Sequence, residues 1–271
     1  MKTLQKTALS AVAASLLSGL AVQSAFAADA PEVSPISANV TVVSDYRYRG
    51  LSQTNQLPAI QGGFDYAHDS GFYIGNWNSS ISWVVDQGYA RSAPIEMDFY
   101  GGFKKELIGE GFASDIGVLQ YYYPTSGATA GFTNPNTFEI YGAQNFTFGP
   151  ISGFAKLSYA TTPIFGWTGS AGSTYSDLTL NYDTGFMGLV VNAHVGYQKY
   201  AGSGGPGVGL SNDALNYADY KLGVTKDLGA GLSLSAAYIG TSASNNTNYF
   251  NLTNGKTMAG NTGIVSLTKA F

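Results

Sequence analysis

Short segments in which apolar and polar residues alternate recur along almost the whole chain, and no other feature constrains the fold as strongly. Residues 95–104 read IEMDFYGGFK, where Ile95 and Met97 alternate with Glu96 and Asp98. Successive side chains of a strand point to opposite faces, so this pattern predicts a strand with one apolar and one polar face. A soluble sheet fits the pattern, and so does a strand between lipid and a wet lumen.

About twelve such segments are predicted as strands, each close to the 9–11 residues that cross a bilayer at a steep tilt. They are Ala38–Arg49, Leu57–Ala67, Phe72–Ser82, Pro94–Lys104, Phe112–Tyr122, Thr137–Phe148, Ile151–Thr161, Thr174–Tyr182, Phe186–Tyr200, Asn216–Lys226, Gly231–Thr241 and Gly260–Phe271. After the N-terminal segment we find no apolar run of about 18 residues, so no transmembrane helix is predicted. No linker divides this region into two domains.

The connections between these segments alternate in length. Tight turns are predicted at 68–71, 149–150, 183–185 and 227–230, with a slightly longer one at 105–111. Longer polar connections are predicted at 86–93, 124–136, 163–173, 201–215 and 242–259, and the first, Gly50–Gln56, is the shortest of this group. Outer-membrane barrels alternate in this way because their periplasmic turns are short and their extracellular loops are long. The sequence therefore predicts an all-β, transmembrane, antiparallel up-and-down barrel, with both termini in the periplasm, rather than a soluble sandwich.

The composition agrees with a membrane barrel and excludes several other classes. Charged residues make up 11% of the chain, less than half the usual share of about 25%. Disordered chains are poor in aromatics, whereas this chain has 19 Tyr and 15 Phe. Cysteine is absent, which excludes disulfides and thiolate chemistry. A net charge of −4 gives no basic face for nucleic acid.

The two ends of the chain carry targeting signals. Lys2 and Lys6 precede a short apolar stretch that ends in Ala25-Phe26-Ala27, which predicts a secretory signal peptide over residues 1–27, cleaved after Ala27. Residues 28–37 are then expected to form a short periplasmic segment, and residues 38–271 the barrel. The last residue, Phe271, follows alternating apolar residues, a pattern that resembles the C-terminal assembly signal read by the barrel assembly machinery.

The alternation also assigns the two faces of the wall. A lipid-facing Lys or Arg costs roughly 2–4 kcal/mol at mid-bilayer, so the charged face of each strand is expected to line the lumen. The predicted pore-lining residues are Asp45, Arg47, Arg49, Asp65, Glu96, Asp98, Lys104, Glu139, Lys156, Asp177, His194, Asp219 and Lys221. Aromatic residues near strand ends are expected to form interfacial girdles; these are Tyr46, Tyr48, Phe72, Tyr100, Tyr121, Tyr122, Phe148 and Tyr200. The faces of the segment DIGVLQYYY, within 112–122, are left unassigned.

Strand number limits the width of the lumen. Twelve strands about 4.8 Å apart and tilted by about 40° give a backbone diameter of roughly 24 Å, and inward side chains reduce the lumen to about 14 Å. Barrels of eight strands are filled by side chains, whereas those of sixteen to eighteen leave an open channel. A narrow or plugged pore is therefore expected.

The charges of the first predicted strand have two interpretations. Arg47 and Arg49 share a face with Asp45, and acidic residues lie on neighbouring inner walls. They could form a charged constriction that sorts solutes by sign. They could equally form inward salt bridges that brace the barrel, since lumen charges in modest numbers usually pair.

Catalytic and metal sites are not supported by the sequence. Apart from the signal peptide, the only histidines are His68, in a predicted turn, and His194, on an inner face. A serine hydrolase needs His beside Ser with a third orienting group, and no such arrangement is apparent. Two isolated histidines without cysteine are weak metal ligands. We therefore expect no enzymatic activity, no metal and no cofactor.

One stretch carries a family resemblance. The segment ANVTVVSDYRYRGLSQT, from Ala38, followed by PAIQGGFDYAHDSGFYIGNWNSSISW, from Pro58, resembles a proteobacterial family known as TorF-family porins and also as Gcw_chp proteins of unknown function. The resemblance is specific over about Ala38 to Trp83. It implies an outer-membrane barrel and says little about the solute.

These observations predict a porin-like channel in the outer membrane of a Gram-negative bacterium, through which small polar or charged solutes diffuse passively. The alternative is a closed structural or surface-interaction barrel that acts through its extracellular loops. Paired lumen charges and an inward-folded loop would favour that alternative. The expected partners are outer-membrane lipid, the assembly machinery and small polar solutes.

Overall fold

Twelve antiparallel strands close into a barrel, which confirms the predicted fold class. The computed structural model describes residues 34–205 and 207–271, so the predicted signal peptide and the cleavage after Ala27 lie outside the described residues. The barrel strands are β1 (Ile36–Val43), β4 (Ala59–Ala67), β5 (Phe72–Ser80), β7 (Ile95–Gly109), β8 (Phe112–Tyr122), β10 (Thr137–Phe148), β11 (Ile151–Ala160), β12 (Thr174–Asp183), β13 (Leu189–Lys199), β14 (Tyr217–Gly229), β15 (Leu232–Thr241) and β16 (Thr262–Ala270). β1 closes the barrel by pairing with both β16 and β4.

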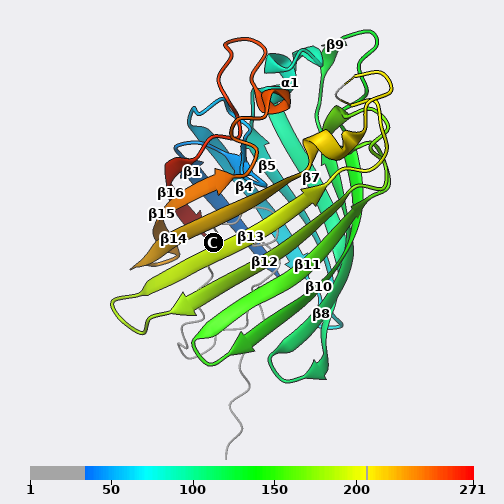
Figure 1. Cartoon of the computed structure of the whole chain (residues 1–271). Coiled ribbons are helices and arrows are strands. Elements are labelled where there is room, and N and C mark those ends of the chain that lie inside the picture. Colours follow the sequence, from blue (N-terminus) through cyan, green and yellow to red (C-terminus); the bar gives the residue numbers. More distant parts are fainter. Residues whose placement is uncertain (1–33, 206) are drawn as a thin grey trace, which may run out of the picture.

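Tight turns join the strands at one end of the barrel, and longer connections gather at the other (Figure 1). The long connections carry short elements: β2 (Arg47–Tyr48), β3 (Leu51–Ser52), α1 (Trp83–Asp86), β6 (Ala90–Ser92), β9 (Ser126–Ala128), η2 (Ile164–Gly166), η3 (Asn212–Leu215) and η4 (Thr247–Tyr249). Buried Ile164, Leu215 and Tyr249 pack together from three of these connections. In the described part of the chain, no helix has the length and apolarity needed to span a membrane.

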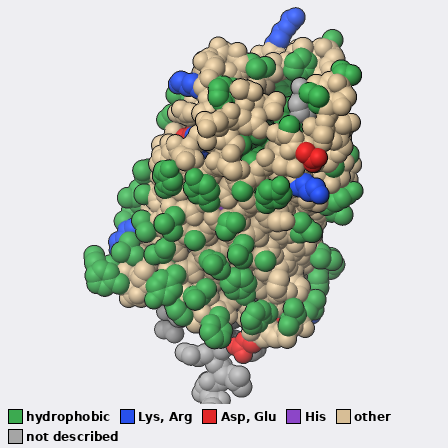
Figure 2. Space-filling view, viewed as in Figure 1, with side chains coloured by type: hydrophobic (Ala, Val, Ile, Leu, Met, Phe, Trp, Pro, Cys, Tyr) green, Lys and Arg blue, Asp and Glu red, His purple; other side chains and the backbone are tan. Residues whose placement is uncertain are grey.

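The outer wall is apolar and the inner wall is polar. Val42, Phe64 and Leu222 are exposed on the outside, whereas Asp65 and Lys221 on the same strands are buried inside. Hydrophobic side chains cover the visible wall of the barrel, and few charges interrupt them (Figure 2). β8, which the sequence left unassigned, turns Asp115 inward and Ile116 outward. The barrel therefore has the polarity expected of a wall with lipid outside, and many of its ionisable groups lie in the lumen.

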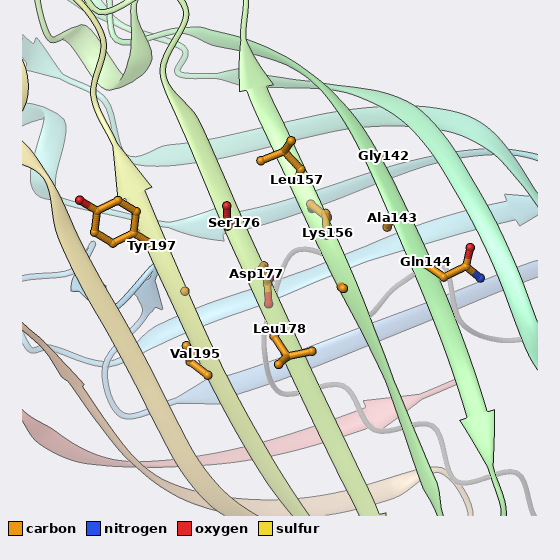
Figure 3. Close-up of a pocket in the computed structure, with 12 residues that line it drawn as sticks. Gly142, Ala143, Gln144, Lys156, Leu157, Ser176, Asp177, Leu178, Val195 and Tyr197 are labelled. Carbon is orange, nitrogen blue, oxygen red and sulfur yellow. The ribbon is translucent and has the colours of Figure 1, made fainter.

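A shallow groove of about 570 Å³ follows the outer wall across β10, β11, β12 and β13. The groove is surrounded by the exposed side chains of Leu157, Leu178, Val195 and Tyr197. Gly142, which has no side chain, adds to its depth (Figure 3). Because its lining is apolar and lies on the lipid face, the groove is part of the membrane-facing surface and not a site for a polar solute.

The first connection differs most from expectation. β1 ends at Val43, and not at Arg49 as predicted, and residues 44–58 do not form a short external loop. β2 and β3 pair as a small hairpin, in register Arg47 with Ser52. This inner hairpin, residues 47–52, lies inside the barrel, because Arg49 at its tip contacts β10 and β13 on the far side. The alternation of DYRYRG is a real strand pattern, but its partner is the next two-residue strand and not the barrel wall.

Several tyrosines predicted for the interfacial girdles lie inside instead. Tyr46, Tyr48, Tyr100, Tyr121 and Tyr200 are buried or nearly so, whereas Phe72, Tyr122 and Phe148 are exposed outside as predicted. A glycine in the neighbouring strand explains how an inward ring can be accommodated. A Cβ on Gly75 would lie only 2.4 Å from the Tyr100 ring, and one on Gly196 2.0 Å from the Tyr175 hydroxyl. The rings lie flat against the wall in spaces that only glycine leaves.

The Gly75 contact can be tested by adding a methyl group. Tyr100 donates a hydrogen bond to Asp65 at 2.5 Å while its ring lies over Gly75. Gly75→Ala displaces the ring and breaks this buried bond, so we expect the free energy of unfolding in liposomes to fall by about 1–3 kcal/mol. Gly142→Ala is the matched control, since a Cβ there meets nothing within 4 Å. Equal effects of the two substitutions would contradict this account.

Candidate functional site

The inner hairpin is fixed by a small network at its base. Asp45 accepts hydrogen bonds from Arg47 Nε at 2.6 Å and from Ser52 Oγ at 2.6 Å. Arg47 Nη1 also donates to three backbone carbonyls, those of Gly50, Met258 and Gly260. An arginine fork suits this arrangement because its several N–H donors are held in one plane. Arg47 is thus an internal brace of the hairpin, and its guanidinium is directed to the connection between β15 and β16.

The hairpin is also attached to the wall near its entry. Tyr46 donates to Glu96 Oε1 at 2.6 Å and packs edge-on against Trp77 on β5. The backbone carbonyl of Gln53 accepts from Ser82 and Trp83 at the start of α1. These contacts hold the whole first connection as an ordered part of the lumen rather than as a loose external loop.

At the hairpin tip, Arg49 crosses the lumen to the opposite wall. Its Nη2 donates to both oxygens of Glu139 at 2.8 Å, and its Nη1 donates to Gln198 Oε1 at 2.7 Å. The guanidinium carbon lies 4.2 Å from the centre of the Tyr175 ring. Burial would lower the pKa of Arg49, but the Glu139 carboxylate raises it, and the pKa lies well above its usual range. Arg49 is therefore a permanent cation in this position.

A ring of carboxylates and tyrosines surrounds the hairpin on β7, β8 and β10. Tyr46 and Tyr123 both donate to Glu96, the latter at 2.7 Å. Asp98, two residues further on the same inward face, is 1% exposed, and neither of its carboxylate oxygens has a hydrogen-bond partner among the described residues. Its cross-strand neighbour is Tyr121, whose hydroxyl lies 3.4 Å from Glu139. Glu139 thus pairs with the Arg49 guanidinium, whereas Glu96 and Asp98 form no ion pair among the described residues.

A second group of ionisable side chains lies on β12, β13 and β14. His194 is placed between two carboxylates, with its Nδ1 3.0 Å from Asp177 and its Nε2 2.8 Å from Asp219. The Tyr175 hydroxyl donates to Asp219 at 2.9 Å. No serine in the described part of the chain hydrogen-bonds His194, so this cluster is not a hydrolase triad. The residues described also contain no cluster of three or more His, Cys, Asp or Glu arranged for a metal ion.

The predicted pore-lining residues fall into two sets by position. Asp45, Arg47 and Arg49 belong to the first connection inside the barrel and not to its wall. The other ten occupy inward-facing positions of the wall: Asp65, Glu96, Asp98, Lys104, Glu139, Lys156, Asp177, His194, Asp219 and Lys221. Lys104 reaches Asn145 at 3.3 Å, and Lys156 lies 4.8 Å over the Tyr141 ring.

Sequence reasoning missed the aromatic members of the lumen. Tyr73 donates to Asp115 at 2.7 Å, and its hydroxyl also pairs with that of Tyr141. Tyr175, whose ring stacks on Arg49, was not singled out either. A glycine opposite an inward tyrosine in the cross-strand register, as for Tyr73 and Gly102, is the signal that could have found them.

Comparison with known proteins agrees with this architecture. The family model described as "Bacterial protein of unknown function (Gcw_chp)" matches residues 27–271. The chain belongs to the Gcw_chp family. A comparison with curated proteins found no match.

Solved structures of porins share the fold of this Gcw_chp protein. A structure of the KdgM porin aligns with a TM-score of 0.52 at 7% identity, covering 87% of this chain and 99% of that one. The NanC porin aligns with a TM-score of 0.53 at 6% identity, covering 86% and 98%. A further structure shows the KdgM porin in complex with disordered oligogalacturonate, at a TM-score of 0.50 and 7% identity. At these identities the likeness shows the porin-like barrel fold.

Proposed function

We propose that this protein is an outer-membrane channel through which small polar or charged solutes diffuse passively, with the inner hairpin as its constriction. The observation that carries the proposal is a closed barrel whose inner wall is lined with ionisable groups and whose lumen the hairpin crosses. A lumen-crossing segment narrows a pore, and the charged groups around it select solutes by sign. The porin-like fold supports the same interpretation.

The proposal includes the location of the protein and the residues that act in it. The chain would be exported by its N-terminal signal peptide, cleaved after Ala27. It would then be assembled into the outer membrane of a Gram-negative bacterium through its C-terminal strand β16 and the Phe271 that follows it. A channel of this kind would agree with the resemblance of residues 38–83 to TorF-family porins. Solutes would meet the wall residues and Arg49 described above, and Asp45 and Arg47 would act by holding the hairpin.

A second candidate function is favoured by the same hairpin. Arg47 and Arg49 are both ion-paired, and the first connection is hydrogen-bonded to the loop that carries α1. A barrel closed in this way could serve a structural role or present its extracellular loops to a surface partner. The two candidates differ in one measurable property, the passage of ions.

Single-channel recording of the refolded chain in a planar bilayer tests the proposal. We expect discrete steps and a reversal potential in a KCl gradient that shows cation preference, because Arg47 and Arg49 are already ion-paired, whereas Glu96 and Asp98 form no ion pair among the described residues. Asp98→Asn should reduce that preference, by about twofold in the permeability ratio if the pair Glu139–Arg49 stays neutral. The control, Asp69→Asn in an exposed turn, should not. A folded barrel that never conducts would favour the closed alternative.

A further inference from the structure

The contacts of Arg49 form a complete recognition site for a planar cation. Glu139 supplies both carboxylate oxygens, Gln198 supplies an amide oxygen, and the Tyr175 ring stacks at 4.2 Å. These three residues come from β10, β13 and β12, so the barrel wall alone builds the site and the hairpin brings only the cation. Carboxylate, amide oxygen and aromatic face together are the partners that guanidinium prefers.

Among the described residues, Arg49 alone forms an ion pair with Glu139. Glu139 is 1% exposed, and apart from Arg49 its only hydrogen-bond partner among the described residues is the Tyr121 hydroxyl, at 3.4 Å. A buried carboxylate without a counter-charge costs several kcal/mol. When the hairpin tip moves away, a cation that pairs with Glu139 therefore stabilises the wall.

Arg49 makes this contact imperfectly. Its Nε is buried without a hydrogen-bond partner in the described part of the chain. Its backbone has φ 46°, in the left-handed region that non-glycine residues rarely adopt. The tether thus imposes a conformational cost and leaves one donor unused, whereas a guanidinium that arrives freely can orient all its donors.

A second, independent observation is a buried carboxyl group beside the site that lacks hydrogen-bond partners among the described residues. Both oxygens of Asp98 lack a hydrogen-bond donor among the residues described, although the side chain is buried. The nearby tyrosine hydroxyls are committed elsewhere: Tyr46 and Tyr123 to Glu96, and Tyr121 to Tyr48. The constriction therefore holds carboxyl oxygens that can accept hydrogen bonds from the N–H groups of a solute.

We propose that Glu139, Gln198 and Tyr175 form the binding site for the guanidinium group of a cationic solute, and that Arg49 is a tethered occupant which the solute displaces. This inference rests on the proposed channel and names its solute class. In the absence of such a solute, Arg49 fills the site and the hairpin spans the lumen. A guanidinium-bearing solute exchanges with Arg49 at the wall, and the hairpin tip, no longer paired, leaves the passage wider.

Calorimetric titration of the refolded chain with methylguanidinium tests the site without relying on conduction. We expect Arg49→Ala to bind methylguanidinium at least tenfold more tightly than wild type, because the tethered competitor is gone. Adding Glu139→Gln to Arg49→Ala should weaken binding at least tenfold. Methylammonium, which lacks the planar fork, should bind Arg49→Ala at least tenfold more weakly than methylguanidinium. Arg91→Ala, a charge deletion at an exposed loop position, should behave as wild type.

Several outcomes would overturn the inference. The inference fails if Arg49→Ala binds no methylguanidinium, if adding Glu139→Gln leaves that binding unchanged, or if Arg49→Ala binds methylammonium equally well. If Arg49→Ala does not fold, Arg49→Lys serves in its place. It keeps the charge but loses the planar fork, so it should bind methylguanidinium more tightly than wild type, and equal binding would contradict exchange.

In bilayers, millimolar methylguanidinium should raise the wild-type current above that in methylammonium at equal ionic strength. A conducting channel without this increase overturns the exchange alone, whereas an absence of conduction in every variant overturns the proposed channel.

Discussion

Replacing the inner hairpin, residues 47–52, with Asn-Gly will raise the single-channel conductance by about threefold or more, because the segment that crosses the lumen is removed. A twelve-stranded barrel leaves a lumen about 14 Å wide before any inserted segment, and conductance grows with the open cross-section. Tyr46 and Gln53 are already joined by a backbone hydrogen bond of 2.8 Å. A two-residue turn can therefore close the gap without disturbing β1 or β4.

The matched control shortens another loop in the same way. Asn251 and Lys256 are also joined by a backbone hydrogen bond of 2.8 Å, and the residues between them, Leu252–Gly255, are exposed. Replacing these four residues with Asn-Gly shortens the β15–β16 connection without entering the lumen, so its conductance should equal that of wild type. Equal conductance of the hairpin deletion and wild type would mean that ions do not pass the hairpin. A silent wild type with a conducting deletion would identify the hairpin as a plug and favour the closed barrel.

The fold could be predicted from the sequence because membrane barrels impose two simple periodicities. The alternation in IEMDFYGGFK assigns Glu96 and Asp98 to the lumen, and a slip of one residue would expose both to lipid. The alternation of short and long connections depends only on which end of the barrel a connection joins. Both patterns are local, and neither requires knowledge of which strands are neighbours.

The constriction could not be predicted in this way, because it depends on contacts between distant residues. The segment DYRYRG alternates as a wall strand does, so its pattern carries no sign that it turns inward at Val43. The inward turn is determined by Arg47, whose partners include Met258 and Gly260, more than 200 residues away. Arg49 likewise finds Glu139 and Gln198 only after the barrel has closed.

The inward positions of several tyrosines could not be predicted either, because they depend on residues of the neighbouring strands. Composition suggests that Tyr belongs to interfacial girdles, and Tyr122 follows that expectation. Tyr100 and Tyr175 can lie inward because Gly75 and Gly196 on the adjacent strands leave room for their rings. The alternation of a single strand shows the side on which a ring lies, but the partner that makes room for it is known only from the register between strands.

Leu222→Arg will lower the free energy of unfolding from liposomes by about 2–4 kcal/mol, the second large effect that the structure predicts. Leu222 is on β14, 61% exposed on the outer wall, and its cross-strand neighbours Ala193 and Tyr238 also face outward. A guanidinium at this position has only lipid around it, so it must deform the bilayer or reach for the interface.

The neighbouring residue provides the control that separates lipid exposure from simple crowding. Lys221, one residue earlier, faces the lumen and is buried. Lys221→Arg keeps the charge on the wet side and should cost less than about 1 kcal/mol, and Leu222→Ala should give the cost of losing the leucine alone. If Leu222→Arg costs no more than Leu222→Ala, the outer face of β14 is in water and not in lipid. Because the register places the apolar residues of every strand on one outer wall, that single result would contradict the membrane assignment of the whole barrel, while Glu96, Asp98 and Glu139 would stay inside it.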